Sequence, residues 1–366
     1  MMTRTTSEPG RETELPGRLG DPARTLAEDR RADPRLVAAL AAFGLDGDQP
    51  PPPVSPSSPR EELLAFVQGA EEGFSAVFSA LFAGLEPVTG VKREMTAIPG
   101  DEEHAVILHL HRPVQRRGDE RALPCVVHFH GGGGVILSAA DPCYTRWRDE
   151  LAKSGLAVVG VEFRNGGGAL GSHPYPAGLS DCASAVRWVT EHKQQLGISN
   201  VIVSGESGGG NLSLAVALKA KQEGWVDELA GVYAMAPMIA SPWDKPDGLP
   251  SQVENDGYFI SCALLAIMGA VYDSSGVNAR DPLCWPSRAT DDDLTALPPH
   301  VISVNELDPL RDEGLAYHRR LVEHGVSAVS RTVNGTVHAG DVFFRAAMPD
   351  VYAATIDDIH DFAVQL

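Results

Sequence analysis

"VIVSGESGGGNLSLAVAL", residues 201–218, is the stretch that decides the fold. A run of β-branched residues leads to Ser207, which lies between glycines, and an apolar pattern with helical spacing follows. This order predicts a strand, a tight turn and a helix. The letters from Gly205 to Gly209 fit G-x-S-x-G, a turn whose strained serine projects its hydroxyl above a sheet. Small residues two before and two after the serine keep side chains from colliding across the turn. A phosphate-binding glycine turn is the alternative interpretation.

The segments on either side of this turn alternate between strand and helix patterns. "HAVILHLHRP", "ALPCVVHFH" and "LAVVGVEFR" predict strands, and "DCASAVRWVTEHKQQLG" predicts a helix. Such alternation predicts an α/β fold with a mostly parallel central sheet flanked by helices. The alternation lapses near residues 238–288, where we expect an insertion above the sheet. We therefore assign residues 101–366 to one catalytic domain that carries this insertion.

The first hundred residues have a different composition and sequence pattern. Residues 1 to about 30 are polar with scattered Pro and Gly, which predicts a disordered tail. Asp33 before Pro34 predicts the start of a short helix, and Ser58 with Glu61 forms a capping-box pattern before a longer apolar one. Residues 1–100 are thus expected to be a tail and helices that lie on the rest of the molecule.

A serine hydroxyl becomes a good nucleophile only when a histidine takes its proton, and a carboxylate must orient that histidine. Each group is expected at the C-terminal end of a strand, in the chain order serine, acid, histidine. Downstream of Ser207, only His338 in "NGTVHAGD" lies in a loop after a late strand. The other downstream histidines fall in helices or at a strand start: His300, His318, His324 and His360. Asp308 ends the preceding strand, with Glu306 and Asp312 as competitors.

A third requirement is a pair of backbone N–H groups for the negative charge that forms on the attacked carbonyl. "VVHFHGGGGV" supplies a glycine run, Gly131 to Gly134, directly after a predicted strand. An H-G-G-G run upstream of a G-x-S-x-G turn is the pairing found in lipases and esterases. His130 is expected to brace this loop, and a merely flexible glycine turn is the alternative.

With these residues assembled, the chain resembles the hormone-sensitive-lipase-like group of α/β-hydrolases, bacterial carboxylesterases in particular. The resemblance covers about residues 100–366 and rests on "HGGGG", "GESGGG", "DPLRDEG" and "VHAGD". It implies an α/β-hydrolase fold with a helical cap, formed by the N-terminal helices and the insertion near residues 240–280. It also implies the site residues: Ser207 as nucleophile, His338 as general base and acid, Asp308 as its partner, and Gly132, Gly133 and Gly208 as oxyanion donors.

The chain departs from the pattern of this group at three places. Where the group has Tyr-Arg-Leu-Ala-Pro-Glu, residues 162–182 read "EFRNGGGALGSHPYPAGLSDC", with extra glycines. Ala339 follows the histidine where glycine is usual, and Gly208-Gly209 replaces the common Ala-Gly. These differences bear on pocket shape and loop position more than on the chemistry.

Other residues were weighed for substrate, metal and cofactor binding. Trp243, Tyr258 and Phe259 are candidates for the lining of an acyl or alcohol pocket, with plain packing of the cap as the alternative. Two pairs of histidines at i, i+2 spacing have no companion carboxylate cluster, so we expect no metal. The glycines at 166–168 do not open a helix in a nucleotide-binding fingerprint, so we expect no dinucleotide and no other cofactor.

Composition narrows the partners and the location. The formal net charge of −19 argues against nucleic acid or an anionic membrane surface as a partner. No apolar run has the roughly 20 residues of a membrane helix, and the first residues lack the apolar segment of a signal peptide, so we expect a cytoplasmic protein. The five cysteines are widely spaced and are expected to be reduced.

Together these features predict a serine carboxylesterase that acts on small-molecule esters without a cofactor. The acidic surface and the absence of a long apolar lid favour soluble short-chain or cyclic esters, lactones included, over lipid. A serine peptidase or amidase on the same scaffold is one alternative. A non-catalytic ligand-binding receptor of the same fold is another, although such receptors have lost the histidine that this chain has at His338. The sequence makes no prediction about subunit number.

Overall fold

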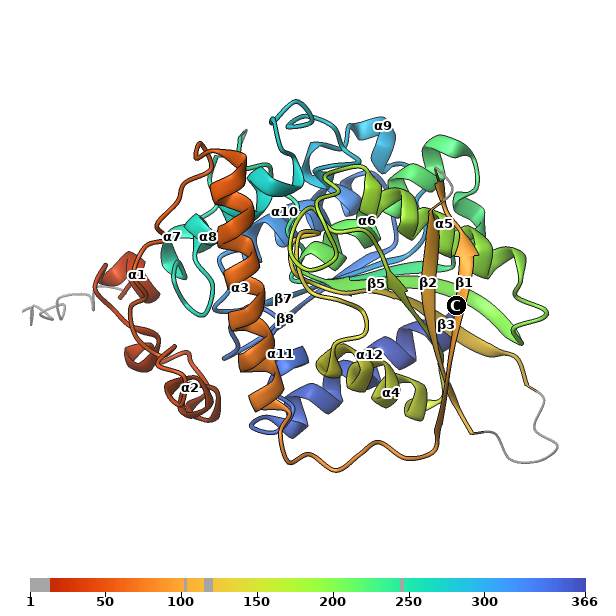
Figure 1. The fold of residues 1–366 in the computed structure, drawn as a ribbon, viewed down its shortest axis with the longest axis horizontal. Helices are drawn as coiled ribbons and strands as arrows, with labels where there is room; N and C mark the ends of the chain where they lie inside the picture. Colours follow the sequence, from red (N-terminus) through yellow and green to blue (C-terminus); the bar gives the residue numbers. More distant parts are fainter. Residues whose placement is uncertain (1–13, 102–103, 115–120, 244–246) are drawn as a thin grey trace, which may run out of the picture.

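A central β-sheet crosses the molecule, with helices on both of its faces (Figure 1). The computed structural model describes residues 14–101, 104–114, 121–243 and 247–366. Within these residues the sheet has eight strands in the order β1-β2-β4-β3-β5-β6-β7-β8. β2 pairs antiparallel with β1 and with β4, and the other neighbouring pairs are parallel. The strands are β1 Val91–Pro99, β2 Ala105–Pro113, β3 Leu123–Phe129, β4 Ala157–Glu162, β5 Ile198–Glu206, β6 Gly231–Met235, β7 His300–Asn305 and β8 Ala328–Val333.

The helices form a layer on each face and a third group above the carboxyl edge of the sheet. α4 (Pro142–Ser154) and α12 (Pro349–Gln365) cover one face, while α5 (Ala177–Glu191), α6 (Gly208–Glu223) and α10 (Arg311–Glu323) cover the other (Figure 1). α3 (Arg60–Leu81) and α8 (Cys262–Tyr272) lie beside each other in the third group. The short helices are α1 Gly17–Gly20, α2 Pro34–Ala41, α7 Ser251–Glu254, α9 Asp291–Leu294 and α11 Gly340–Phe343, with single 3₁₀ turns at Leu26–Glu28, Val226–Glu228 and Pro286–Arg288.

Apolar side chains on both faces of the strands explain why the sheet is covered twice. In β5, Val201 and Val203 belong to the core under α5 and α6, whereas Ile202 belongs to the core under α4 and α12. All three side chains are fully buried. α6 is itself buried over most of its length, from Gly208 through Leu218, so the strand, the turn and the helix form one rigid unit.

The predicted α/β fold is confirmed, but the sheet starts earlier than predicted. We expected its first strand after Gly100, whereas β1 begins at Val91 and pairs with β2. β1 is an edge strand with mostly exposed side chains, including Lys92, Arg93 and Glu94. Charged residues are common on edge strands because they discourage pairing with other chains. Apolar runs therefore do not predict this strand.

The segment before α2 is packed against the molecule, contrary to the predicted tail. Residues 1–13 of that tail lie outside the described residues. From residue 14 onward the chain has defined contacts: Leu26 is 1% exposed, and the Glu28 carboxylate accepts a hydrogen bond from the Thr25 N–H. One buried leucine in an otherwise polar segment was too weak a signal to predict this.

The predicted helix starts were right in one case and wrong in the other. Asp33 caps α2 and accepts a hydrogen bond from the Arg35 N–H, with Pro34 at the first helical position. The capping box expected at Ser58 does not form, because α3 begins after Pro59 and the Ser58 Oγ accepts instead from the Ser55 N–H. No helix within the described ranges is both long and apolar enough to cross a bilayer.

Candidate active site

Ser207 occupies a sharp turn between β5 and α6, at the carboxyl edge of the sheet. Its backbone angles are φ 59° and ψ −118°, a strained conformation for a residue with a side chain. A methyl group on Gly205 would lie 2.3 Å from the Phe129 carbonyl oxygen, and one on Gly209 would lie 2.0 Å from the same oxygen. The close approach of β3 therefore requires glycine on both sides of the serine.

Asp308 and His338 are hydrogen-bonded to each other. Asp308 Oδ2 and His338 Nδ1 are 2.8 Å apart, and the second carboxylate oxygen accepts from the Leu310 N–H at 2.9 Å. Asp308 is fully buried, while His338 is 6% exposed and lines the same cavity as Ser207. A carboxylate can only accept, so the imidazole Nδ1 carries the hydrogen and Nε2 is left as the acceptor.

The two competing acids serve other contacts. Glu306 Oε2 accepts from the Gly335 N–H at 2.8 Å, and Asp312 Oδ2 accepts from the Ser251 N–H at 2.8 Å. Of the three candidate carboxylates, the structure thus brings Asp308 to the histidine.

Asn305, at the end of β7, holds the backbone that carries His338. Its Oδ1 accepts from the Ala339 N–H at 3.0 Å, and its Nδ2 donates to Thr336 at 2.8 Å and to Asp341 at 2.9 Å. Ala339 has a φ of 49°, which a glycine would adopt with less strain. We did not predict this role for Asn305, although a buried amide at the end of the strand before the acid was a usable signal.

The glycine run after β3 packs directly against the start of α6. Gly132, Gly133 and Gly134 have φ values of 93°, 67° and 69°. A methyl group on Gly208 would lie 2.6 Å from the Gly133 nitrogen and 2.5 Å from the Gly134 nitrogen. The alanine that is common at this place in the resembled group therefore does not fit here. The same closeness gathers backbone nitrogens of the loop beside Ser207.

A buried carboxylate ties the glycine loop to β5. Glu206 is fully buried, and its Oε1 accepts from the Gly131 N–H at 2.6 Å while its Oε2 lies 3.1 Å from His128 Nε2. These contacts join the last residue of β5 to the loop that follows β3. In the G-x-S-x-G pattern Glu206 is only the variable position, so the motif does not predict this role. A charged residue between a buried strand and a buried helix was the signal for its role.

His130 braces the glycine loop from the other side. Its ring stacks on Phe163 with 4.2 Å between ring centroids, and its Nδ1 donates to the Gly131 carbonyl at 2.8 Å. Its Nε2 is buried and has no hydrogen-bond partner among the described residues. Burial therefore lowers the pKa of His130 from 6.5 to about 4.

The extra glycines of residues 166–168 allow their loop to lie against α3. A methyl group on Gly168 would lie 2.8 Å from the Glu71 carboxylate. Glu71 is 8% exposed and accepts from the N–H groups of Leu137 and Ala169, each at 2.7 Å. The Glu71 carboxylate of α3 thus connects Leu137, which follows the glycine loop, with Ala169. Ala169 lies in the segment that departs from the pattern of the resembled group.

Two helices enclose the cavity above Ser207. α3 contributes Phe74 and Phe78, and the latter ring stacks on Phe343 with 4.1 Å between centroids. α8 contributes three apolar side chains: Leu264, Leu265 and Met268. The cavity holds about 60 Å³, and the polar side chains in its lining are Tyr144, Glu206, Ser207 and His338.

Of the three aromatic residues expected in a pocket, only Phe259 lines this cavity. Trp243 is 42% exposed and packs over Gly276. Tyr258 is buried, but its hydroxyl lies 3.2 Å from an oxygen of Asp29 in the N-terminal segment. Both therefore fit the alternative of plain packing, because sequence spacing does not say which side of a turn faces a cavity.

The histidine pairs weighed for metal binding have structural partners. His111 Nδ1 lies 2.8 Å from Asp149 Oδ1, and His128 contacts Glu206. Across the ranges that the structure describes, no group of three or more His, Cys, Asp or Glu side chains could hold a metal ion.

The chain is similar to known esterases over most of its length. A family model for the α/β-hydrolase fold matches residues 126–341. Among solved structures, brefeldin A esterase, a bacterial homologue of human hormone-sensitive lipase, is 43% identical, with a TM-score of 0.91 over 96% of this chain and 98% of that one. Carboxylesterase NlhH of Mycobacterium tuberculosis is 34% identical over 64% of this chain and 71% of its own length. Esterase LipI of the same organism is 30% identical over 65% and 71%.

The depressed pKa of His130 predicts a pH-dependent stability. Between pH 6.5 and about 4 the unfolded chain binds a proton at this position and the folded chain does not, so the free energy of unfolding falls as the pH falls through this window. In His130→Asn the amide keeps a donor but does not titrate. Urea unfolding at several pH values should give a shallower slope for the variant, by at most about 1.4 kcal/mol per pH unit. Parallel pH curves for the two proteins would rule out the shift.

Proposed function

Because this chain belongs to the α/β-hydrolase fold family and is a carboxylic ester hydrolase, we propose that it cleaves small-molecule esters through an acyl-enzyme on Ser207. The observation that carries the proposal is the 2.8 Å hydrogen bond between Asp308 and His338, in a cavity that Ser207 also lines. Nucleophile, acid and base then follow the carboxyl ends of β5, β7 and β8, at one edge of the sheet, which is the set of groups that acyl transfer requires.

In the first step the Ser207 oxygen attacks the ester carbonyl carbon, and His338 Nε2 takes the serine proton. The positive charge that forms on the imidazole is stabilised by Asp308 across the Nδ1 hydrogen bond. The carbonyl oxygen becomes an oxyanion beside the backbone N–H groups that we assign to Gly132, Gly133 and Gly208. Support for this assignment is the close packing of Gly208 on the glycine loop, where a methyl group on Gly208 would lie within 2.6 Å of the Gly133 and Gly134 nitrogens.

In the second half of the reaction the carbon–oxygen bond to the alcohol breaks, and His338 gives its proton to the departing alkoxide. Water then enters, His338 takes one of its protons, and the hydroxide attacks the acyl-enzyme. Collapse of this second intermediate returns the proton to Ser207 and releases the acid. The proton transfers and bond changes of this reaction use only residues of the chain, the ester and water.

The inner cavity favours a short acyl group. Its volume of about 60 Å³ has room for only a few groups the size of water. Its lining is mostly aromatic and aliphatic, and part of it comes from α3 and α8, which we propose act as a cap. Soluble short-chain esters fit this space, whereas a long lipid chain does not.

A larger apolar groove adjoins the cavity and suits the alcohol part of the ester. It holds about 630 Å³ and shares four lining residues with the cavity: Phe74, Phe259, Ile260 and Leu264. None of its lining residues is charged, and the amide of Gln49 and the hydroxyl of Ser261 are already bonded to the backbone. An uncharged, bulky alcohol therefore fits better than a charged one. A cyclic ester, whose acyl and alcohol parts stay joined, would span the cavity and the groove. A substrate of this class agrees with the similarity of this chain to brefeldin A esterase.

Hydrolysis of p-nitrophenyl esters from acetyl to decanoyl tests the proposal. Wild type is expected to turn over the acetyl to butyryl members fastest, because longer chains exceed the inner cavity. Ser207→Ala and His338→Ala should lower kcat by about 10⁴-fold or more, and Asp308→Asn by somewhat less. Equal turnover by wild type and Ser207→Ala would refute the acyl-enzyme, and a decanoyl optimum would refute the short-acyl class.

The role of Glu206 in holding the glycine loop predicts a loss in kcat. In Glu206→Ala the Gly131 N–H loses its buried acceptor, so the oxyanion donors should shift and kcat should fall by about 10- to 100-fold with little change in KM. Glu206→Gln keeps an acceptor oxygen and serves as the control, with a smaller loss. Equal kcat in wild type and Glu206→Ala, at matched folded fractions, would contradict this role.

The groove predicts a specificity change that leaves the chemistry intact. Gly73 lies in the middle of α3 and lines the groove, with nothing within 4 Å of a methyl group placed on it. Gly73→Leu should fill the groove and lower kcat/KM for menthyl acetate by ~10-fold, while ethyl acetate changes less than about twofold. Gly73→Ala is the matched control, because it improves helix propensity by about 0.5–1 kcal/mol and fills little space. Equal losses on both esters would argue against the groove as an alcohol site.

A further inference from the structure

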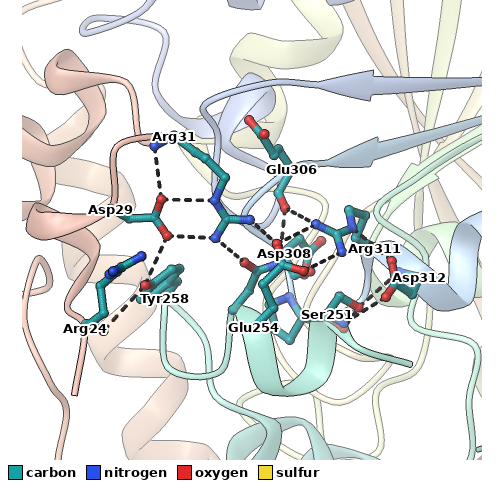
Figure 2. A network of polar contacts seen from close by, with 12 residues as sticks. Arg24, Asp29, Arg31, Ser251, Glu254, Tyr258, Glu306, Asp308, Arg311 and Asp312 are labelled. Carbon is teal, nitrogen blue, oxygen red and sulfur yellow. Dashed lines mark hydrogen bonds and ion pairs between the residues drawn. The ribbon is translucent and has the colours of Figure 1, made fainter. Parts of the chain in front are cut away.

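The N-terminal segment contacts both loops that carry the acid and the base. This segment, residues 29–33, lies outside residues 126–341, which the family model matches. Figure 2 shows its Arg31 beside Glu254, which in turn contacts Arg311, the first residue of α10 after the loop that holds Asp308. The inference that follows rests on the proposed roles of Asp308 and His338.

Glu254 is shared by two arginines from distant parts of the chain. Arg31 pairs with its Oε1, and Arg311 donates to Oε1 at 3.0 Å and to Oε2 at 2.9 Å (Figure 2). Glu254 is 3% exposed, whereas the side chains of Arg31 and Arg311 are 18% and 16% exposed, so both contacts are partly buried. Arg311 also donates to the Glu306 carbonyl at 3.0 Å. The ion pairs thus connect the N-terminal segment with both ends of the loop that holds Asp308.

Asn255 carries the connection to Asp308 itself. Its Oδ1 accepts from Arg31 at 3.1 Å, and its Nδ2 donates to the carbonyl oxygens of Glu306 and Asp308, each at 3.1 Å. Asn255 is fully buried. Because Arg31 supplies only donors, it fixes the Asn255 amide with its oxygen toward the guanidinium and its nitrogen toward the acid loop.

Arg31 is itself held by the segment to which it belongs. Asp29 accepts from Arg31 Nε at 3.0 Å and from Nη2 at 2.7 Å, a bidentate pair, and Tyr258 donates to the same carboxylate at 3.2 Å. Burial opposes the charge on Asp29, but these hydrogen bonds outweigh it and hold the pKa of Asp29 below its usual value. The guanidinium is therefore aimed at Glu254 and Asn255 with little freedom.

The same segment also touches the loop of the base. The Asp33 N–H donates to the Gly335 carbonyl at 3.0 Å, and the Gly335 N–H donates to Glu306 Oε2 at 2.8 Å. Gly335 lies three residues before His338. Residues 29–33 thus form a bridge from the acid loop to the base loop.

We propose that residues 29–33 are a positioning segment for the Asp308–His338 pair, with Arg31 acting on Asp308 through Glu254 and Asn255. Buried ion pairs add little net stability, because desolvation offsets their attraction. Their geometric effect is large, since an acid displaced by about 1 Å can cost ~100-fold in rate. The segment therefore contributes to kcat while touching neither substrate nor Ser207.

A double-mutant cycle on the full chain tests this coupling. Arg31→Met, measured on p-nitrophenyl acetate, should lower kcat by ~10- to 100-fold with KM within about twofold of wild type. In an Asp308→Asn background, where the acid is already lost, the same change should have little further effect. Arg24→Met is the matched control, because Arg24 lies in the same N-terminal region and pairs with the exposed Glu14. It should keep wild-type kcat.

Two results would overturn the proposal. One is wild-type kcat in Arg31→Met, and the other is an equal loss in the wild-type and Asp308→Asn backgrounds, which indicates general destabilisation. If Arg31→Met does not fold, Arg31→Lys and Asn255→Ala are put through the same cycle and read by the same criteria. The proposed function is tested separately, because Ser207→Ala must abolish turnover whether or not Arg31 affects it.

Discussion

The active site depends on the close packing of two glycines against the Phe129 carbonyl oxygen. Gly205 and Gly209, on either side of the serine, both lie so close to it that no side chain fits between them. β3, β5 and the start of α6 are thereby locked together, and the strain at Ser207 is sustained by buried neighbours rather than relaxed. The glycine loop leaves β3 directly after this oxygen, and the contacts of Gly131 with Glu206 and His130 hold the loop beside the serine.

Asp308 and His338 follow β7 and β8, whereas Ser207 follows β5. All three lie at the carboxyl edge of the sheet. β5, β7 and β8 are parallel within one sheet, so the loops after them open on the same side. Asn305 then fixes the histidine loop and Leu310 fixes the acid, each through a buried hydrogen bond. A site built this way depends on strand ends and on buried hydrogen bonds for its geometry.

Three buried glutamates connect segments that are distant in the sequence. Glu206 joins β5 to the glycine loop, Glu71 joins α3 to two loops beside it, and Glu254 joins the N-terminal segment to the acid loop. Each is less than a tenth exposed and has its charge matched by N–H donors or by arginines. The chain has a net charge of −19, but these three carboxylates lie in the interior, where each holds two segments together.

The sequence by itself determined the alternation of strands and helices, the turn at Ser207 and the loop positions of Asp308 and His338, because short-range patterns encode them. It did not determine β1, an edge strand with polar side chains. Nor did it determine how Arg31 packs, because its partners Glu254 and Asn255 lie more than 200 residues away. It also could not separate Phe259, at the cavity, from Tyr258, which faces the N-terminal segment. Only the tertiary structure decided these, because the direction of a side chain in a turn and the partner of a buried charge depend on long-range contacts that no local pattern specifies.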